Sequence, residues 1–274
     1  MRATDRRVRG SARSGRLVSA VSASAQTASP ATLLLFDIDG TLLQRAASAH
    51  AAALHTALAE VFDIRDARRH EIEAAGRTDV EIARDLLGRS GITTATIDAH
   101  ADALARAWMR AYSKSCEPDL SHTVAPGIPA LLGQLAARAD VHLALLTGNL
   151  EPIARLKLDR AGIGHHFVVG QGAFGSDSED RTQLPAIARA RAGGEQGAPW
   201  PRERTVLIGD TPRDIACARA DGVRVLAVAT GGYTVEQLAD ADGVAADASA
   251  LWPLLDAALG GARSIIPDSS SIMS

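Results

Sequence analysis

Two aspartates, Asp37 and Asp39, follow the apolar run at residues 32–36 and stand directly before Gly40 and Thr41. A carboxylate can attack phosphorus as a covalent nucleophile, and a neighbouring acid can protonate the leaving oxygen and then activate water. Two other interpretations use the same residues, namely an ordinary Asp-Gly turn and the start of a calcium loop. The calcium loop is disfavoured because its fifth position would be Thr41, and no glutamate stands at its twelfth.

A second polar cluster, Thr147-Gly148-Asn149, directly follows the apolar run at residues 141–146. A hydroxyl and an amide beside a glycine, which lets backbone N–H groups approach a ligand, can hold phosphate oxygens with neutral donors. The alternative is a strand-to-helix turn in which Asn149 caps the next helix.

A third cluster, containing Asp210 and Asp214, follows the apolar run at residues 205–208. Helix capping explains Asp214, because Thr211 suits the N-cap position and Pro212 the first helical position. It does not explain Asp210. Three or four converging carboxylates would repel one another without a metal, whereas such oxygen ligands suit Mg²⁺ completed by waters and a phosphate.

Lys157 lies on a predicted helix at residues 150–161, and at 100° per residue it falls in the middle of an apolar face. Its stem could extend to solvent, or its ammonium could reach over the sheet edge to the acids and a phosphate. The chain has 27 arginines and only two lysines, Lys114 and Lys157. Lysine in such a composition favours the second interpretation.

The elements that must position these residues are short apolar runs without alternation, which are typical of strands buried on both faces. They lie at residues 32–36, 141–146, 205–208 and 223–228, with a weaker one at 167–169. Helical segments separate the later runs and end at Gly162 and Gly222. This alternation predicts an α/β fold with a parallel sheet covered by helices, whose ligands bind at the carboxyl ends of the strands.

Residues 44–124 interrupt this alternation with an Ala-rich segment that has helical patterns at 51–62, 80–87 and 97–112. We therefore predict a helical insert at 44–124 and a core domain from 31–43 and 125–259. Residues 1–30, rich in Arg, Ser and Ala, and the tail at 260–274 have compositions that build no core. The first segment resembles an organelle targeting peptide, or is a disordered extension.

The motifs occur in an order that resembles the haloacid dehalogenase superfamily of phosphohydrolases, and the resemblance covers residues 32–258. They are DxDGTL at 37–42, LLTGN at 145–149, a later lysine and GDTPxD at 209–214. The resemblance implies a Rossmann-like core with Asp37 as nucleophile, Asp39 as general acid and base, and Thr147 as phosphate binder. It also implies that Lys157 neutralises charge and that Mg²⁺ binds Asp37, the Asp39 carbonyl and Asp210, with Asp214 as support or ligand.

Asp39 is typical of the phosphatase and mutase members, since the dehalogenases of the superfamily lack it. The helical insert looks like the C1-type cap of the phosphoglycolate phosphatase-like branch. In the cap, residues 76–79 are a candidate loop facing the substrate, with Arg77 as a binding residue. The alternative is a plain helix N-terminus capped by Thr78.

The position of the lysine departs from the family pattern. Many members carry it shortly before the last motif, where this chain has Arg181. We predict that Lys157, from the helix after LLTGN, takes this role instead of Arg181.

These patterns predict a Mg²⁺-dependent phosphatase that hydrolyses a small phosphorylated metabolite through an aspartyl-phosphate. The alternatives are a phosphomutase with the same residues and a catalytically silent binding protein. The sequence does not indicate which phosphomonoester is the substrate, nor the oligomeric state.

The overall composition predicts no nucleic-acid or membrane partner. The net charge is −3 with interspersed signs, and no apolar run approaches the length of about 20 residues that spans a bilayer. Two distant cysteines, Cys116 and Cys217, suggest small core residues in a reducing compartment. A cytoplasmic location is expected unless the N-terminus directs import into an organelle.

Overall fold

The computed structural model describes residues 31–66, 72–193 and 197–260, so the extension predicted at 1–30 and nearly all of the predicted tail lie outside the described residues. A six-stranded parallel sheet with the order β3-β2-β1-β4-β5-β6 forms its centre. The strands are β1 (Thr32–Phe36), β2 (Val141–Thr147), β3 (Ala173–Phe174), β4 (Thr205–Gly209), β5 (Arg224–Val228) and β6 (Gly243–Ala245).

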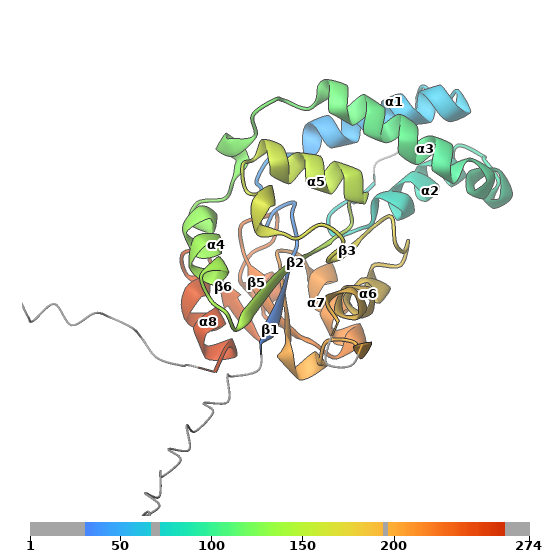
Figure 1. Cartoon of the computed structure of the whole chain (residues 1–274). Helices are drawn as coiled ribbons and strands as arrows, with labels where there is room; N and C mark the ends of the chain where they lie inside the picture. The colour runs from blue at the N-terminus through green and yellow to red at the C-terminus, as the bar shows by residue number, and fades with distance from the viewer. Residues whose placement is uncertain (1–30, 67–71, 194–196, 261–274) are drawn as a thin grey trace, which may run out of the picture.

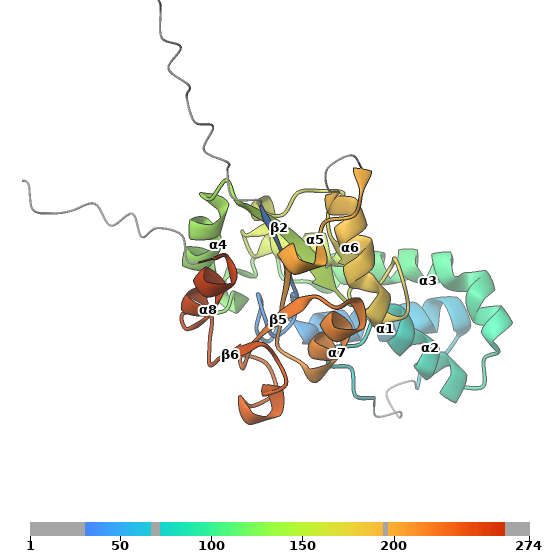
Figure 2. The same ribbon diagram turned by 90° about the horizontal axis from the view of Figure 1, so that it is seen from below.

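Strand β1 lies between β2 and β4 in the middle of the sheet, and all five of its side chains are buried. Leu34 and Phe36 point into one apolar cluster, and Leu33 and Leu35 into another. Helices α4 (Ile128–Ala136) and α8 (Leu251–Ala258) cover one face of the sheet, and α6 (Leu184–Ala192) and α7 (Pro212–Asp221) the other (Figures 1 and 2). Burial on both faces explains the uninterrupted apolar runs, and the predicted α/β fold is confirmed.

Three helices between β1 and β2 lie beyond the carboxyl ends of the strands (Figure 1). They are α1 (Ala47–Phe62), α2 (Asp79–Arg89) and α3 (Thr94–Ser115). The chain leaves and re-enters the core at one point, where Leu43 forms an antiparallel bridge with Val124. All three predicted helical patterns in the insert are helices. Each observed helix extends beyond its predicted pattern.

The weaker strand predicted at residues 167–169 is wrong. Phe167 follows a 3₁₀ turn, and the side chains of Val168 and Val169 are exposed to solvent. The strand at this place in the sheet is β3, only two residues long, and β6 at the other edge has three. Segments this short carry no periodic signal, so the sequence did not indicate them.

Other local predictions are confirmed. Gly222 ends α7 in a left-handed conformation, and Gly162, with a φ of 75°, follows Ala161, the C-cap residue of α5 (Glu151–Arg160). Cys116 and Cys217 are free and buried. Among the described helices, none combines the length and apolarity needed to cross a membrane.

Truncation in the central strand should destabilise the fold strongly. Leu35 is fully buried, so Leu35→Ala should lower the free energy of unfolding by about 3 kcal/mol, through lost apolar burial and the cavity left behind. Urea titration of the full chain measures this value. Val169→Ala, at a side chain that is 82% exposed, is the control and should change it by less than about 0.5 kcal/mol. Equal effects of the two substitutions would contradict the observed core.

Candidate active site

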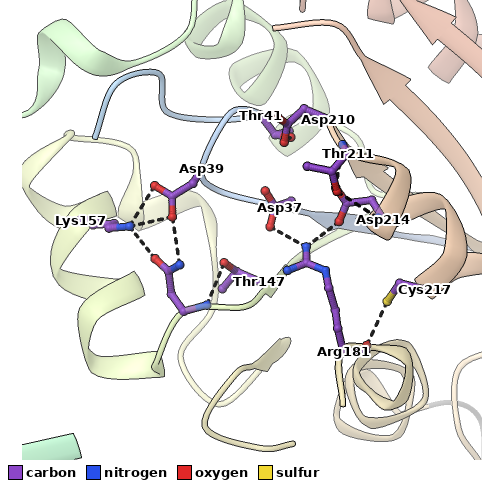
Figure 3. A network of polar contacts seen from close by, with 11 residues as sticks. Asp37, Asp39, Thr41, Thr147, Lys157, Arg181, Asp210, Thr211, Asp214 and Cys217 are labelled. Carbon is purple, nitrogen blue, oxygen red and sulfur yellow. Dashed lines mark hydrogen bonds and ion pairs between the residues drawn. The ribbon is translucent and has the colours of Figure 1, made fainter. Parts of the chain in front are cut away.

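Three adjacent strands, β2, β1 and β4, end at the same edge of the sheet and bring their polar residues together there (Figure 3). Asp37 follows β1, Thr147 ends β2 and Asp210 follows β4. A cavity of about 390 Å³ lies between this edge and the helical insert, and all three residues line it. The predicted convergence of the three motifs is therefore present.

Asp37, Asp210 and Asp214 form a buried carboxylate cluster whose ligand oxygens all lie within 4.8 Å of one another. Burial raises the pKa of Asp37 to about 7, and the charge of Asp214 adds to this although Arg181 opposes it. Burial, followed by repulsion from Asp37 and Asp214, raises the pKa of Asp210 to about 8. Three closely spaced carboxylates whose negative charge is not fully compensated fit a hard divalent cation such as Mg²⁺.

The DxDGT loop is shaped to admit Asp210. Gly40 has a φ of 95°, and a Cβ at this position would lie 2.1 Å from Asp210 Oδ2, so a side chain cannot be accommodated. Thr41 Oγ1 donates a hydrogen bond to Asp210 Oδ1 at 3.2 Å. The glycine and the hydroxyl thus fix the carboxylate of one motif against the backbone of another.

Asp214 belongs both to a helix cap and to the site. Thr211 is the N-cap of α7, and it forms a reciprocal capping box with Asp214, with Pro212 in the first turn, as the sequence predicts. The second oxygen of Asp214, Oδ1, accepts a hydrogen bond from Arg181 at 2.5 Å. The capping box therefore holds this carboxylate through one oxygen and leaves the other to contact groups of the site.

Arg181 is the cation beside Asp37. One of its terminal nitrogens, Nη2, donates to Asp37 Oδ1 at 2.9 Å as well as to Asp214, and the side chain is buried (Figure 3). It comes from the 3₁₀ turn η4 (Arg181–Gln183), which begins with Asp180 accepting a bond from the Thr182 N–H. Arg181, which stands before the last motif where many family members carry a lysine, thus lies beside Asp37.

Lys157 reaches the acids, as its apolar surroundings suggested, but it contacts Asp39 instead of Asp37. Its Nζ lies 2.7 and 2.9 Å from the two Asp39 oxygens and 2.7 Å from Asn149 Oδ1. Burial alone would raise the pKa of Asp39, but the charge of Lys157, with smaller contributions from His50 and from the hydrogen bonds of Lys157 and Asn149, holds that pKa below its usual range. The Asp39 side chain is not part of the carboxylate cluster.

Asn149 is not a helix cap. The N-cap of α5 is Leu150, which makes no side-chain cap. The Asn149 amide instead donates to Asp39 Oδ2 at 2.9 Å and accepts from Lys157. This arrangement orients the Asp39 carboxylate from two sides.

His50 of α1 is a buried residue of the site that the sequence did not indicate. Its Nδ1 lies 3.0 Å from Lys157 Nζ, and its Nε2 lies 3.1 Å from Asp79 Oδ2 in a direction unsuited to a straight hydrogen bond. Because a lysine ammonium can only donate, a hydrogen bond at this contact requires Nδ1 as the acceptor. No motif marked this histidine, because the Ala-rich sequence of α1 around it shows no recognisable catalytic pattern.

The LLTGN loop supports the helical insert as well as lining the cavity. Thr147 is buried, and its Oγ1 accepts the Asn149 N–H at 3.3 Å. The Gly148 carbonyl accepts the Asp79 N–H at 2.7 Å, and a Cβ on Gly148 would lie 2.0 Å from the Arg77 carbonyl oxygen. Glycine is therefore required for the close approach of the two loops.

The loop at residues 76–79 combines both sequence interpretations. Thr78 caps α2 by accepting the Glu81 N–H, and Gly76, Arg77 and Asp79 line the cavity. The Arg77 guanidinium lies 2.7 Å from Glu81 and 3.1 Å from Asp85. Its charge is therefore already paired.

Comparisons with known proteins agree with this architecture. A family model described as haloacid dehalogenase-like hydrolase matches residues 34–219. The tyrosine-protein kinase PtkA of Mycobacterium tuberculosis is 33% identical over 203 residues, or 73% of this chain, which spans 62% of that relative's length. A phosphoglycolate phosphatase of Rhodospirillum rubrum is 31% identical over 218 residues, covering 75% of this chain and 82% of the relative.

Among solved structures, a hydrolase from Pseudomonas syringae has a TM-score of 0.58 at 23% identity, covering 82% of this chain and 98% of that chain. This likeness shows the fold. The family model covers more than half of the sequence and includes all three motifs at the sheet edge. The chain therefore belongs to the haloacid dehalogenase-like hydrolases.

Proposed function

We propose that this protein is a Mg²⁺-dependent phosphatase that hydrolyses a small phosphomonoester through an aspartyl-phosphate on Asp37. The observation that carries the proposal is the position of Asp37. It lines the cavity, it belongs to the buried carboxylate cluster, and Arg181 contacts one of its oxygens. Family membership and relatives named phosphoglycolate phosphatase support the same reaction class.

In the proposed reaction an oxygen of Asp37 attacks phosphorus, and the bond from phosphorus to the leaving oxygen breaks. Asp39 must enter this step in its protonated form, from which it gives a proton to that oxygen; it regains a proton when it deprotonates the water that hydrolyses the aspartyl-phosphate. Thr147 and the backbone of Gly148 and Asn149 bind phosphoryl oxygens. Bound Mg²⁺, held by Asp37, Asp210, Asp214 and the Asp39 carbonyl, would stabilise the negative charge of the transferring group.

We propose separate roles for the two buried cations. Arg181 lines the cavity beside Asp37, so it is placed to neutralise the phosphoryl group. Lys157 is fully buried behind Asp39, where it holds the orientation and charge of the acid and base. This assignment departs from the sequence-based prediction, which gave the role beside the phosphoryl group to Lys157.

We further propose that residues 44–124 act as a cap domain over the site. The contacts of Asp79 with Gly148 and of Thr78 with the Glu179 carbonyl at 2.7 Å hold the insert against the core. A cap in this position excludes bulk water from the reacting groups.

Loss of the nucleophile should abolish turnover. We expect the wild-type protein with Mg²⁺ to release phosphate from small phosphomonoesters, phosphoglycolate included, and Asp37→Asn to lower kcat by at least about 10⁴-fold because no aspartyl-phosphate can form. Phosphate assay gives the rates, and EDTA should abolish wild-type release until Mg²⁺ is restored. Asp240→Asn, at an exposed acid outside the site, is the control for loss of a carboxylate. Release that persists in Asp37→Asn or in EDTA would refute the mechanism.

Substitution of Arg181 and of Lys157 should have different effects on inhibition by inorganic phosphate. Arg181→Ala should lower kcat/KM by about 10²-fold or more and weaken inhibition by inorganic phosphate, because the phosphoryl group loses a charged partner. Lys157→Ala should lower kcat to a similar degree but leave phosphate inhibition within about twofold, because it acts through Asp39. Arg181→Lys should recover part of the activity. Weaker phosphate inhibition in Lys157→Ala alone would restore Lys157 to the phosphoryl group.

A phosphomutase remains the nearest rival, because it would use the same residues but return the phosphoryl group to another hydroxyl. Product analysis separates the two: a phosphatase forms free phosphate, whereas a mutase forms an isomeric sugar phosphate. A silent binding protein is disfavoured, because crowding of Asp37, Asp210 and Asp214 opposes folding and has no evident use without a cation. A cytoplasmic location stays a prediction.

A further inference from the structure

The cavity has two walls of different chemistry. Its floor is the polar sheet edge, with Asp37, Thr147 and Asp210. The facing wall comes from the insert and the segment leading into it, and it is predominantly apolar. Its larger apolar side chains are Leu43, Leu54, Ile82 and Trp108, and several alanines complete it.

Most charged groups on the facing wall already have partners. Arg77 is paired with Glu81 and Asp85. His50 lies between Lys157 and Asp79, and Asp79 also accepts the Leu150 N–H at 2.7 Å. These groups have little capacity left to bind a second charge on a ligand.

Arg45 is the exception on this wall. Within the described ranges it has no hydrogen bond or ion pair, and it is exposed at the surface. A ligand group placed deeper in the cavity would contact the aliphatic and aromatic side chains instead. A carboxylate or a set of sugar hydroxyls placed there would lose water without gaining partners.

We infer that the leaving group of the substrate has an uncharged, apolar body that lies against Leu54, Ile82 and Trp108. This inference rests on the proposed phosphatase function and names its substrate class. The phosphoryl group would occupy the polar floor, and the apolar body would gain free energy by leaving water. The volume of about 390 Å³ accommodates a phosphomonoester with a ring or a branched chain.

Three phosphomonoesters test the inference on the wild-type protein with Mg²⁺: benzyl phosphate, ethyl phosphate and phosphoglycolate. Each is the ester of a primary alcohol of similar acidity, so their intrinsic reactivities are close. We expect kcat/KM for benzyl phosphate to exceed that for each of the others by at least about tenfold, because an apolar pocket discriminates by this order for small changes in apolar contact.

A pair of variants on α2 tests the wall itself. Both Ile82 and Val80 are partly buried. Ile82 lines the cavity, whereas Val80 packs against the apolar cluster that contains Leu34 and Phe36 and does not line the cavity. Ile82→Asn should lower the ratio of kcat/KM for benzyl phosphate over ethyl phosphate by about tenfold. Val80→Asn introduces the same polar group on the same helix and should leave that ratio unchanged. An unchanged ratio in both variants would overturn the assignment of the wall.

The outcomes distinguish this inference from the proposed function. Equal rates for the three esters, or a preference for phosphoglycolate, would overturn the inference and leave the phosphatase function standing. No phosphate release from any ester would overturn the function. In that case, calorimetric titration of Asp37→Asn with benzyl and ethyl phosphate decides the ligand class. Binding of benzyl phosphate at least about tenfold tighter supports it, and equal binding overturns it.

Discussion

The structure depends on placing negative charge in a buried position at one edge of the sheet. Asp37, Asp210 and Asp214 come from two neighbouring strand ends and a helix start, and burial together with mutual repulsion raises the pKa values of Asp37 and Asp210. Several features lower the free-energy cost of burying these carboxylates or make space for them. Gly40 makes room for Asp210, the α7 capping box binds one oxygen of Asp214, and Arg181 supplies positive charge to the cluster. The negative charge that Arg181 leaves uncompensated makes the site suited to a divalent cation.

Asp37 and Asp39 are only two positions apart, yet they lie in opposite electrostatic environments. Asp37 faces other carboxylates and has a raised pKa, whereas Asp39 faces Lys157 and has a lowered one. The separation follows from the fold, because Arg181 approaches from the side of β3 and α6 while Lys157 approaches from α5 (Figure 3). Neighbouring carboxylates in different environments can take different roles in one reaction. The proposed nucleophile must be ionised, and a cation bound at the cluster would favour that form of Asp37. The proposed acid must carry a proton, which the charge of Lys157 opposes in the free protein.

The sequence predicted the sheet edge well because buried strands and their polar ends leave local signals. The run at 32–36, the acids after it and the Thr211 cap could all be recognised within a few residues. Contacts between distant segments left no such signal. Helical periodicity placed Lys157 on an inward face but could not determine which acid it meets. His50 contacts Lys157 across 107 positions of sequence, from a helix without any motif. The family pattern marked the position of Arg181, but no local signal showed that its side chain meets Asp37.

The same distinction explains why the motifs predict a reaction but no substrate. The polar floor is built by strand ends whose spacing is constrained, whereas the facing wall is built by α1, α2 and α3, where any residues that pack well are tolerated. Arg77 illustrates the consequence. The sequence marks it as a cation beside the site, but the fold pairs its charge with Glu81 and Asp85 and leaves the wall around it apolar. Substrate selectivity therefore depends on which charged side chains of the insert are already in ion pairs. Tertiary packing determines those pairs.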